Sequence, residues 1–272
     1  MRSRINFIIA AFILMLFSCE DVTDFYLGIP MQPEFTENTF VEGMNIFGLL
    51  RPDDFNGFNK SFVYVQQNWP ILEITDSSFN IIKQADIQLF RMENEQFADT
   101  INLPLMPPGP GFNDTLYRPQ QSFNPVPGNT YRLICSHREL PTAIGETVFP
   151  SPPRIVSNSL KVNNGIISLD IESDPGIRML DIYISGSAFT GITGRYVTSD
   201  SASVHVSFPY QGTGTLGIEI YGYDANLASY YSNSNTSLNF NKYRTTFSTL
   251  EEGFGVFGSL NRTAIEFAIP QK

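Results

Sequence analysis

The chain has 272 residues and a formal charge of −10 at pH 7, with 17 Lys and Arg against 27 Asp and Glu. This acidic balance argues against nucleic acid and anionic lipid as electrostatic partners. Hydrophobic residues make up 42% of the chain and charged residues only 16%, with 23 Phe, 12 Tyr, 20 Gly and 18 Pro, so the composition favours β-structure over long charged helices.

The first 18 residues predict a secretory signal peptide. Arg2 and Arg4 give it a positive end, and residues 7–17 form an unbroken apolar run. This run of eleven residues is too short for a membrane-spanning helix, which takes roughly 20. We therefore expect residues 1–18 to be removed, and the loss of both arginines lowers the charge of the mature chain to −12.

The end of the signal peptide predicts a site of lipid attachment. Leu16-Phe17-Ser18-Cys19 resembles the lipobox of bacterial lipoproteins, in which the peptide is cut before the cysteine and the thiol receives a diacylglycerol. Each buried methylene contributes about 0.8 kcal/mol, so two or three acyl chains hold a protein stably at a membrane. We therefore expect lipidation of Cys19. An ordinary signal peptide that ends near a cysteine is the alternative.

Residues 19–37 predict a tether, because they contain Pro30 and Pro33 and show no sustained periodicity. Glu20 and Asp21 follow the anchor directly, and acidic residues at this place resemble the surface-export signal of Bacteroidota lipoproteins. The resemblance implies that the body lies on the cell surface. A solvated acidic linker is the alternative interpretation.

Short runs rich in β-branched and aromatic residues predict a first β-domain over residues 38–150. The runs cover residues 40–50, 61–66, 86–92, 100–105, 115–117, 130–136 and 146–149. Phe55 and Phe58 lie in the loop after the first run, and Trp69 follows the second. These aromatics are candidates for a ligand or partner platform, and a cap folded onto the domain is the alternative.

The run at residues 130–136 carries two informative patterns. Pro127-Gly128-Asn129-Thr130-Tyr131 resembles the entry to a late strand in fibronectin-III and immunoglobulin-like sandwiches, where the tyrosine pins a corner. Cys135 shares a strand face with Tyr131, which predicts a buried, inert thiol. A catalytic pair with His137 has no Asp or Asn placed to orient it. With His205 the only other histidine, we expect no metal site and no cofactor.

Pro150-Ser151-Pro152-Pro153 predicts a rigid boundary, and residues 151–272 predict a second β-sandwich. Its expected strands cover residues 166–171, 179–185, 194–198, 203–208 and 216–224. Residues 225–232 predict a short helix with Asp224 as its N-cap. Glu219, Tyr221 and Tyr223 lie on one strand face, which we expect this helix to cover. A sugar-binding aromatic stripe is the alternative. The fold class is therefore all-β, with two immunoglobulin- or fibronectin-III-like sandwiches.

The tail contains a misleading motif. Gly253-Phe254-Gly255-Val256-Phe257-Gly258 matches G-x-G-x-x-G, but dinucleotide binding requires a helix after the glycines and an acidic residue roughly 20 positions further on. Only fourteen residues remain, and residues 263–269 alternate as a strand. We therefore expect a bulge or a close backbone approach before a final strand.

Residues 249–258 also carry the strongest family resemblance. They are similar to the tail signature of DUF4249, a family of Bacteroidota envelope lipoproteins, although Leu250 and Glu252 depart from its consensus. The resemblance implies a two-sandwich lipoprotein of the outer membrane that accompanies a TonB-dependent receptor. It implies no enzyme activity and transfers no catalytic residue. In that setting Thr100, Thr115 and Ser201, each following an aspartate, resemble acceptors of Bacteroidota O-glycosylation.

These observations favour a non-enzymatic accessory lipoprotein of an outer-membrane receptor or assembly complex. The alternative is a surface protein that binds a glycan or another ligand through Phe55, Phe58, Trp69 or the tyrosines of the second domain. A hydrolase fits poorly, because the sequence has no G-x-S-x-G motif. A hydrolase that uses two carboxylates would need both on the same side of a site, and the adjacent Glu251 and Glu252 would point to opposite faces of a strand.

Overall fold

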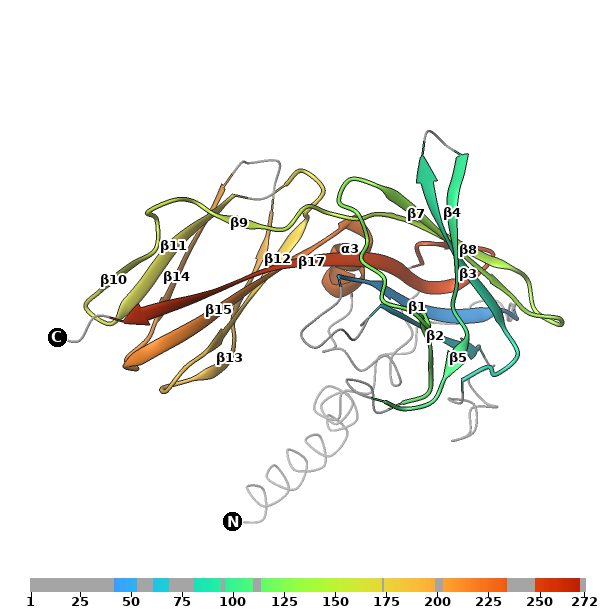
Figure 1. Cartoon of the computed structure of the whole chain (residues 1–272), viewed down its shortest axis with the longest axis horizontal. Helices are drawn as coiled ribbons and strands as arrows, with labels where there is room; N and C mark the ends of the chain where they lie inside the picture. The colour runs from blue at the N-terminus through green and yellow to red at the C-terminus, as the bar shows by residue number, and fades with distance from the viewer. Residues whose placement is uncertain are drawn as a thin grey trace, which may run out of the picture. The chain divides into compact units, whose positions relative to one another are not determined.

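The computed structural model describes residues 42–52, 61–68, 81–93, 96–109, 114–172, 174–198, 203–233 and 248–269. All of them belong to one compact unit, residues 42–272. Apart from the helix α3 (Ala225–Asn233), the regular elements of this described part are β-strands in three sheets (Figure 1). This confirms a mostly β fold with a short helix late in the chain. The immunoglobulin-like arrangement of the sheets stays a prediction.

The largest sheet has eight strands in the order β13-β12-β15-β17-β1-β2-β6-β5. Its strands are β1 (Met44–Leu50), β2 (Phe62–Gln67), β5 (Leu105–Met106), β6 (Leu116–Tyr117), β12 (Met179–Ser185), β13 (Thr190–Val197), β15 (Gly214–Tyr223) and β17 (Phe254–Ile269). All neighbours pair antiparallel except β1 and β17, which run parallel. The sequence did not indicate this parallel pair.

Two smaller sheets complete the fold. A five-stranded sheet has the order β16-β8-β7-β3-β4, and a four-stranded sheet has β10-β11-β14 with β9 paired to β11. Their strands are β3 (Asp86–Glu93), β4 (Gln96–Asn102), β7 (Thr130–Ser136), β8 (Ala143–Val148), β9 (Arg154–Ile155), β10 (Lys161–Asn163), β11 (Ile166–Glu172), β14 (Ser203–Pro209) and β16 (Leu250–Glu251). Most lie within a few residues of the predicted runs.

The long strand β17 connects the three buried clusters of apolar side chains. On one face Phe257 packs with Leu133 of the five-stranded sheet. Further along the same face, Ile265 packs with Leu169 of the four-stranded sheet. On the opposite face, Leu260 packs with side chains of α3. We call that opposite side of the eight-stranded sheet the α3-side face.

Of the tail glycines, Gly253 precedes β17, whereas Gly255 and Gly258 lie within it, so the prediction that the glycines precede the final strand was wrong for these two. Gly255 has φ of 100°, and a Cβ added there would collide with the carbonyl oxygen of Ile46 on β1. At Gly258 a Cβ would meet Leu227 and Asp224 beside α3. The glycines therefore permit the close backbone approaches that the sequence suggested, but inside the strand.

Candidate functional site

Several predicted site residues cannot be placed. The lipidation site, the export signal, the loop aromatics and one glycosylation candidate lie outside the described residues: Cys19, Glu20, Asp21, Phe55, Phe58, Trp69 and Ser201. Their roles stay predictions.

The other two glycosylation candidates differ in exposure. Thr100 is exposed on β4, the terminal strand of the five-stranded sheet, and its backbone N–H donates to Asp99 Oδ1 at 2.9 Å. Thr115 is half-buried just before β6. Of the two, Thr100 is the more accessible hydroxyl. An intact mass equal to that of the bare lipidated chain would contradict glycosylation at either residue.

Cys135 is a buried thiol, as predicted. Its side chain is 0% exposed on β7, and burial raises the pKa of the thiol far above its usual value. A thiol must lose its proton to act as a nucleophile. His137 is half-buried, and its Nδ1 accepts a hydrogen bond from the Glu139 N–H at 3.3 Å. These surroundings favour a packing role for Cys135.

Asp224 caps α3, as the sequence predicted. Its Oδ1 accepts a hydrogen bond from Leu227 N at 2.8 Å, and Oδ2 accepts one from Ser259 N on β17 at 2.9 Å. The hydroxyls of Thr147 on β8 and Ser259 also contact Oδ2. Asp224 is 4% exposed, and burial raises its pKa to about 6 in spite of these donors. This carboxyl therefore joins three elements, and nothing in the sequence indicated Thr147 or Ser259 as its partners.

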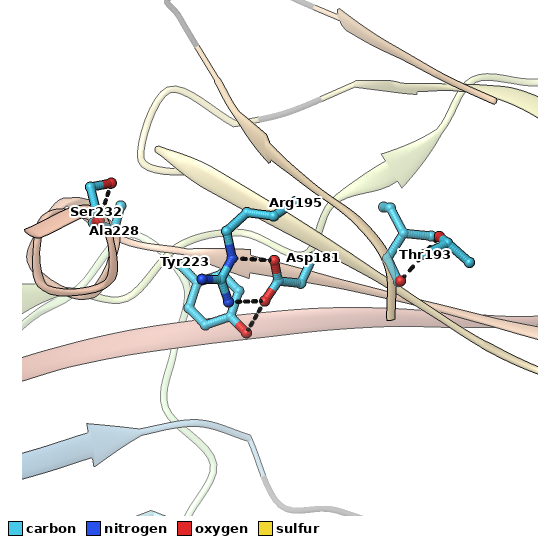
Figure 2. A network of polar contacts seen from close by, with 7 residues as sticks. Asp181, Thr193, Arg195, Tyr223, Ala228 and Ser232 are labelled. Atoms are coloured by element: carbon cyan, nitrogen blue, oxygen red, sulfur yellow. Dashed lines mark hydrogen bonds and ion pairs between the residues drawn. The ribbon is translucent and has the colours of Figure 1, made fainter. Parts of the chain in front are cut away.

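A second buried acid lies on the α3-side face. Figure 2 shows the guanidinium of Arg195 facing the carboxylate of Asp181, with the Tyr223 hydroxyl beside it. Arg195 Nε and Nη2 each donate to Asp181 at 2.8 Å, and Tyr223 donates to Oδ2 at 3.0 Å. Arg195 also lies over the ring of Tyr231, 5.2 Å from its centroid. Asp181 interrupts the otherwise apolar run at 179–184, and this was the signal that could have identified it as a buried acid.

The helix covers only part of the aromatic face that the sequence singled out. Tyr223 is 8% exposed and packs edge-on against Tyr231 of α3. Tyr221 stays half-buried, and its hydroxyl donates to Glu219 Oε2 at 2.5 Å. Arg262 Nη1 contacts the same oxygen at 3.0 Å. Burial and the adjacent Glu219 raise the pKa of Tyr221 to about 12. The predicted cover is therefore confirmed for Tyr223.

The partly accessible group Glu219, Tyr221 and Arg262 is the best candidate site in the described residues. It combines an aromatic ring, a carboxylate and a guanidinium on neighbouring strands. Such groups hydrogen-bond to polar ligands and stack against their apolar faces. In the described part of the chain, no cluster of three His, Cys, Asp or Glu side chains could hold a metal ion.

Comparisons with known proteins give little further guidance. No family model matches the sequence, and no curated protein matches it. Among solved structures, a DUF3823 family protein from Parabacteroides merdae ATCC 43184, a member of the Bacteroidota, aligns over 66% of this chain and 90% of its own. The identity is 14% and the TM-score 0.21, so the match carries no argument about fold or function.

None of the helices in the described ranges is long and apolar enough to cross a membrane.

Proposed function

We propose that this protein is a lipid-anchored lipoprotein of the outer membrane, placed at the cell surface. In this proposal it acts without catalysis as an accessory subunit of a TonB-dependent receptor or an assembly complex. The observation that carries the proposal is the lipobox ending at Cys19, followed at once by Glu20 and Asp21. Acylation of Cys19 would attach the β-rich body to the membrane through its acidic tether.

The proposal includes membership of DUF4249 and a pair of immunoglobulin-like sandwiches. Residues 249–258 support the family assignment. The Tyr131 hydroxyl supports the sandwich, because it accepts a hydrogen bond from Val126 N at 2.8 Å. A tyrosine bonded to the backbone a few residues upstream is typical of these sandwiches. A non-catalytic role is supported by Asp181 and Asp224, two buried acids that hold strands and α3 together.

Purification from the native host tests this function. With a tag after Lys272 and a mild detergent, we expect one outer-membrane receptor to co-purify in stoichiometric amount. The Cys19→Ser variant cannot be acylated, so it should leave the membrane fraction and lose that partner. Recovery of anchored protein with no stoichiometric membrane partner would contradict the accessory role. A Cys19→Ser variant that stays in the membrane fraction would contradict the anchor.

A second candidate function is ligand binding at the surface, and the group Glu219, Tyr221 and Arg262 favours it. A glycan array tests this candidate directly. We expect Tyr221→Ala or Trp69→Ala to abolish binding of any glycan that the wild type retains. Phe97→Ala is the control, because it removes an aromatic side chain that is 56% exposed on β4, in a different sheet. Equal loss in the control would indicate non-specific adhesion.

A further inference from the structure

Strand β13 is a long edge strand without lysine or proline. It ends the eight-stranded sheet in the described part of the chain, and the other end is β5, two residues long and followed by Pro107 and Pro108. Terminal strands offer backbone N–H and C=O groups to other chains, and proteins commonly protect them with Lys, Pro or very short strands. The eight residues of β13 include neither Lys nor Pro. This edge therefore lacks those three protections, although it contains a bulge, which is a further device found at sheet edges.

The same edge exposes apolar side chains. Val197 is 76% exposed and Ile192 57% exposed, and Phe189, just before the strand, is 48% exposed. Each of the other terminal strands described here carries at most one exposed large apolar side chain, Phe97 on β4 being the example. Clusters of exposed apolar side chains commonly mark interaction sites.

A bulge places Ile192 and Val197 on one face of the sheet. Gly194 lies opposite Ile182 and Ile192 lies opposite Tyr183, so Thr193 is an extra residue in β13. Without this bulge, Ile192 and Val197 would point to opposite faces, because they are five residues apart. With it, both share the α3-side face with Arg195, which pairs with Asp181. The edge therefore combines two apolar side chains with one partly exposed arginine, whose guanidinium also reaches Asp181 on β12.

We propose that two copies of this chain associate by antiparallel pairing of β13 with β13, around a two-fold axis at Gly194. When the bulge is taken into account, this register places Val197 opposite Thr190 of the second copy and Ile192 opposite its Arg195. Symmetry makes each contact twice, as in any isologous interface. The eight-stranded sheets then continue from one copy into the other.

A second copy fits this edge because the edge complements itself. In the register centred on Gly194, no charged side chain lies opposite a like charge, and Ile192 and Val197 of both copies lie on the same face of the continued sheet. Shifting the axis to Arg195 would place two guanidinium groups opposite each other. The mature chain carries −12 overall, so the copies repel at long range, and salt should strengthen their association. This association is independent of the proposed receptor partner.

Two substitutions at Ile192 test the register. Both remove the same exposed apolar side chain, but Ile192→Lys places a like charge opposite Arg195 of the second copy and Ile192→Glu places an opposite charge there. In the full-length protein in mild detergent, sedimentation velocity over a range of concentrations should show a reversible dimer. We expect Lys to weaken it about tenfold relative to Glu, since two symmetric charge pairs change sign. Phe97→Lys on β4 should leave it unchanged.

Cross-linking gives an independent measurement. Residues directly opposite each other in an antiparallel pair have Cα atoms about 4.5–5.5 Å apart, which suits a disulfide. The double variant Thr190→Cys/Val197→Cys should therefore form covalent dimers with a mild oxidant such as copper phenanthroline, and neither single variant should. A monomer at all concentrations, equal weakening by Lys and Glu, or absence of the cross-link in the double variant would overturn the proposal. Thermal unfolding should verify that each variant is folded.

Discussion

Asp224→Asn is expected to remove most of the change in stability between pH 4 and pH 7. The carboxyl is buried, and its pKa rises from 3.8 to about 6 on folding. It binds its proton more tightly in the native state, so its contribution to stability is fully present below pH 3.8 and is lost as the pH rises through 6. The loss amounts to about 3 kcal/mol, because one pKa unit corresponds to about 1.4 kcal/mol. Asparagine stays neutral and still caps the helix.

Urea unfolding at pH 4.5, 5.5, 6.5 and 7.5 measures this effect. The wild type should lose stability with rising pH relative to Asp224→Asn. Glu266→Gln removes an exposed carboxyl from β17 and controls for the change in net charge. If the stabilities of the wild type and Asp224→Asn changed in parallel with pH, this would contradict the raised pKa of the buried Asp224 carboxyl.

Asp224→Ala should be less stable than Asp224→Asn at every pH in that range, because neither side chain can ionise. Alanine removes the N-cap bond to Leu227 N–H, worth about 1 kcal/mol, and also leaves the buried Ser259 N–H without its acceptor. An unsatisfied buried N–H costs about 1–3 kcal/mol. We therefore expect Asp224→Ala to be about 1–3 kcal/mol less stable than Asp224→Asn, whose amide oxygen still accepts one of these bonds.

Arg195→Ala is expected to destabilise the native state by about 2–3 kcal/mol. The Asp181 side chain is 2% exposed, so the substitution leaves a buried carboxylate with only the Tyr223 hydroxyl as a hydrogen-bond donor among the contacts described above. Breaking a fully buried pair costs about 3–5 kcal/mol. Arg195 is 45% exposed, so water can replace part of its interaction and the expected loss is smaller.

A double-mutant cycle separates the pair from other effects. Asp181→Asn removes the charge that Arg195 balances and still accepts a bond from Tyr223. The double variant Arg195→Ala/Asp181→Asn should therefore be more stable than Arg195→Ala alone. Arg195→Lys keeps the charge but not the two-pronged contact, and we expect an intermediate loss. An Arg195→Ala variant within 0.5 kcal/mol of the wild type, a margin typical of surface substitutions, would contradict a structural role for the pair.

Local patterns predicted individual elements well. Alternation identified β3, β7 and β11, and an aspartate before a short polar and aromatic run identified α3 with Asp224 as its cap. The burial of Cys135 followed from its strand face. These features depend on residues close together in the sequence, so a single sequence contains the information for them.

Contacts between distant segments were not predictable in the same way. Nothing local indicates that β1 pairs parallel with β17, or that Thr147 and Ser259 meet at Asp224. The same is true of Arg195, whose guanidinium reaches Asp181 only because β12 and β13 are neighbours. The partners of a buried polar group depend on which strands become adjacent, and the hydrophobic pattern of one strand fits many neighbours.

The sequence by itself therefore determined the strand-rich character of this protein and the capped helix, because each depends on a short run of residues. Lipid attachment at Cys19 follows from a pattern of the same kind and stays a prediction. Only the tertiary structure decided that Gly255 and Gly258 lie inside β17 and that one sheet runs from β13 to β5. It also decided that the bulge at Thr193 places Ile192 and Val197 on one face. These features result from strand order and register, which are set by packing between segments far apart in the chain.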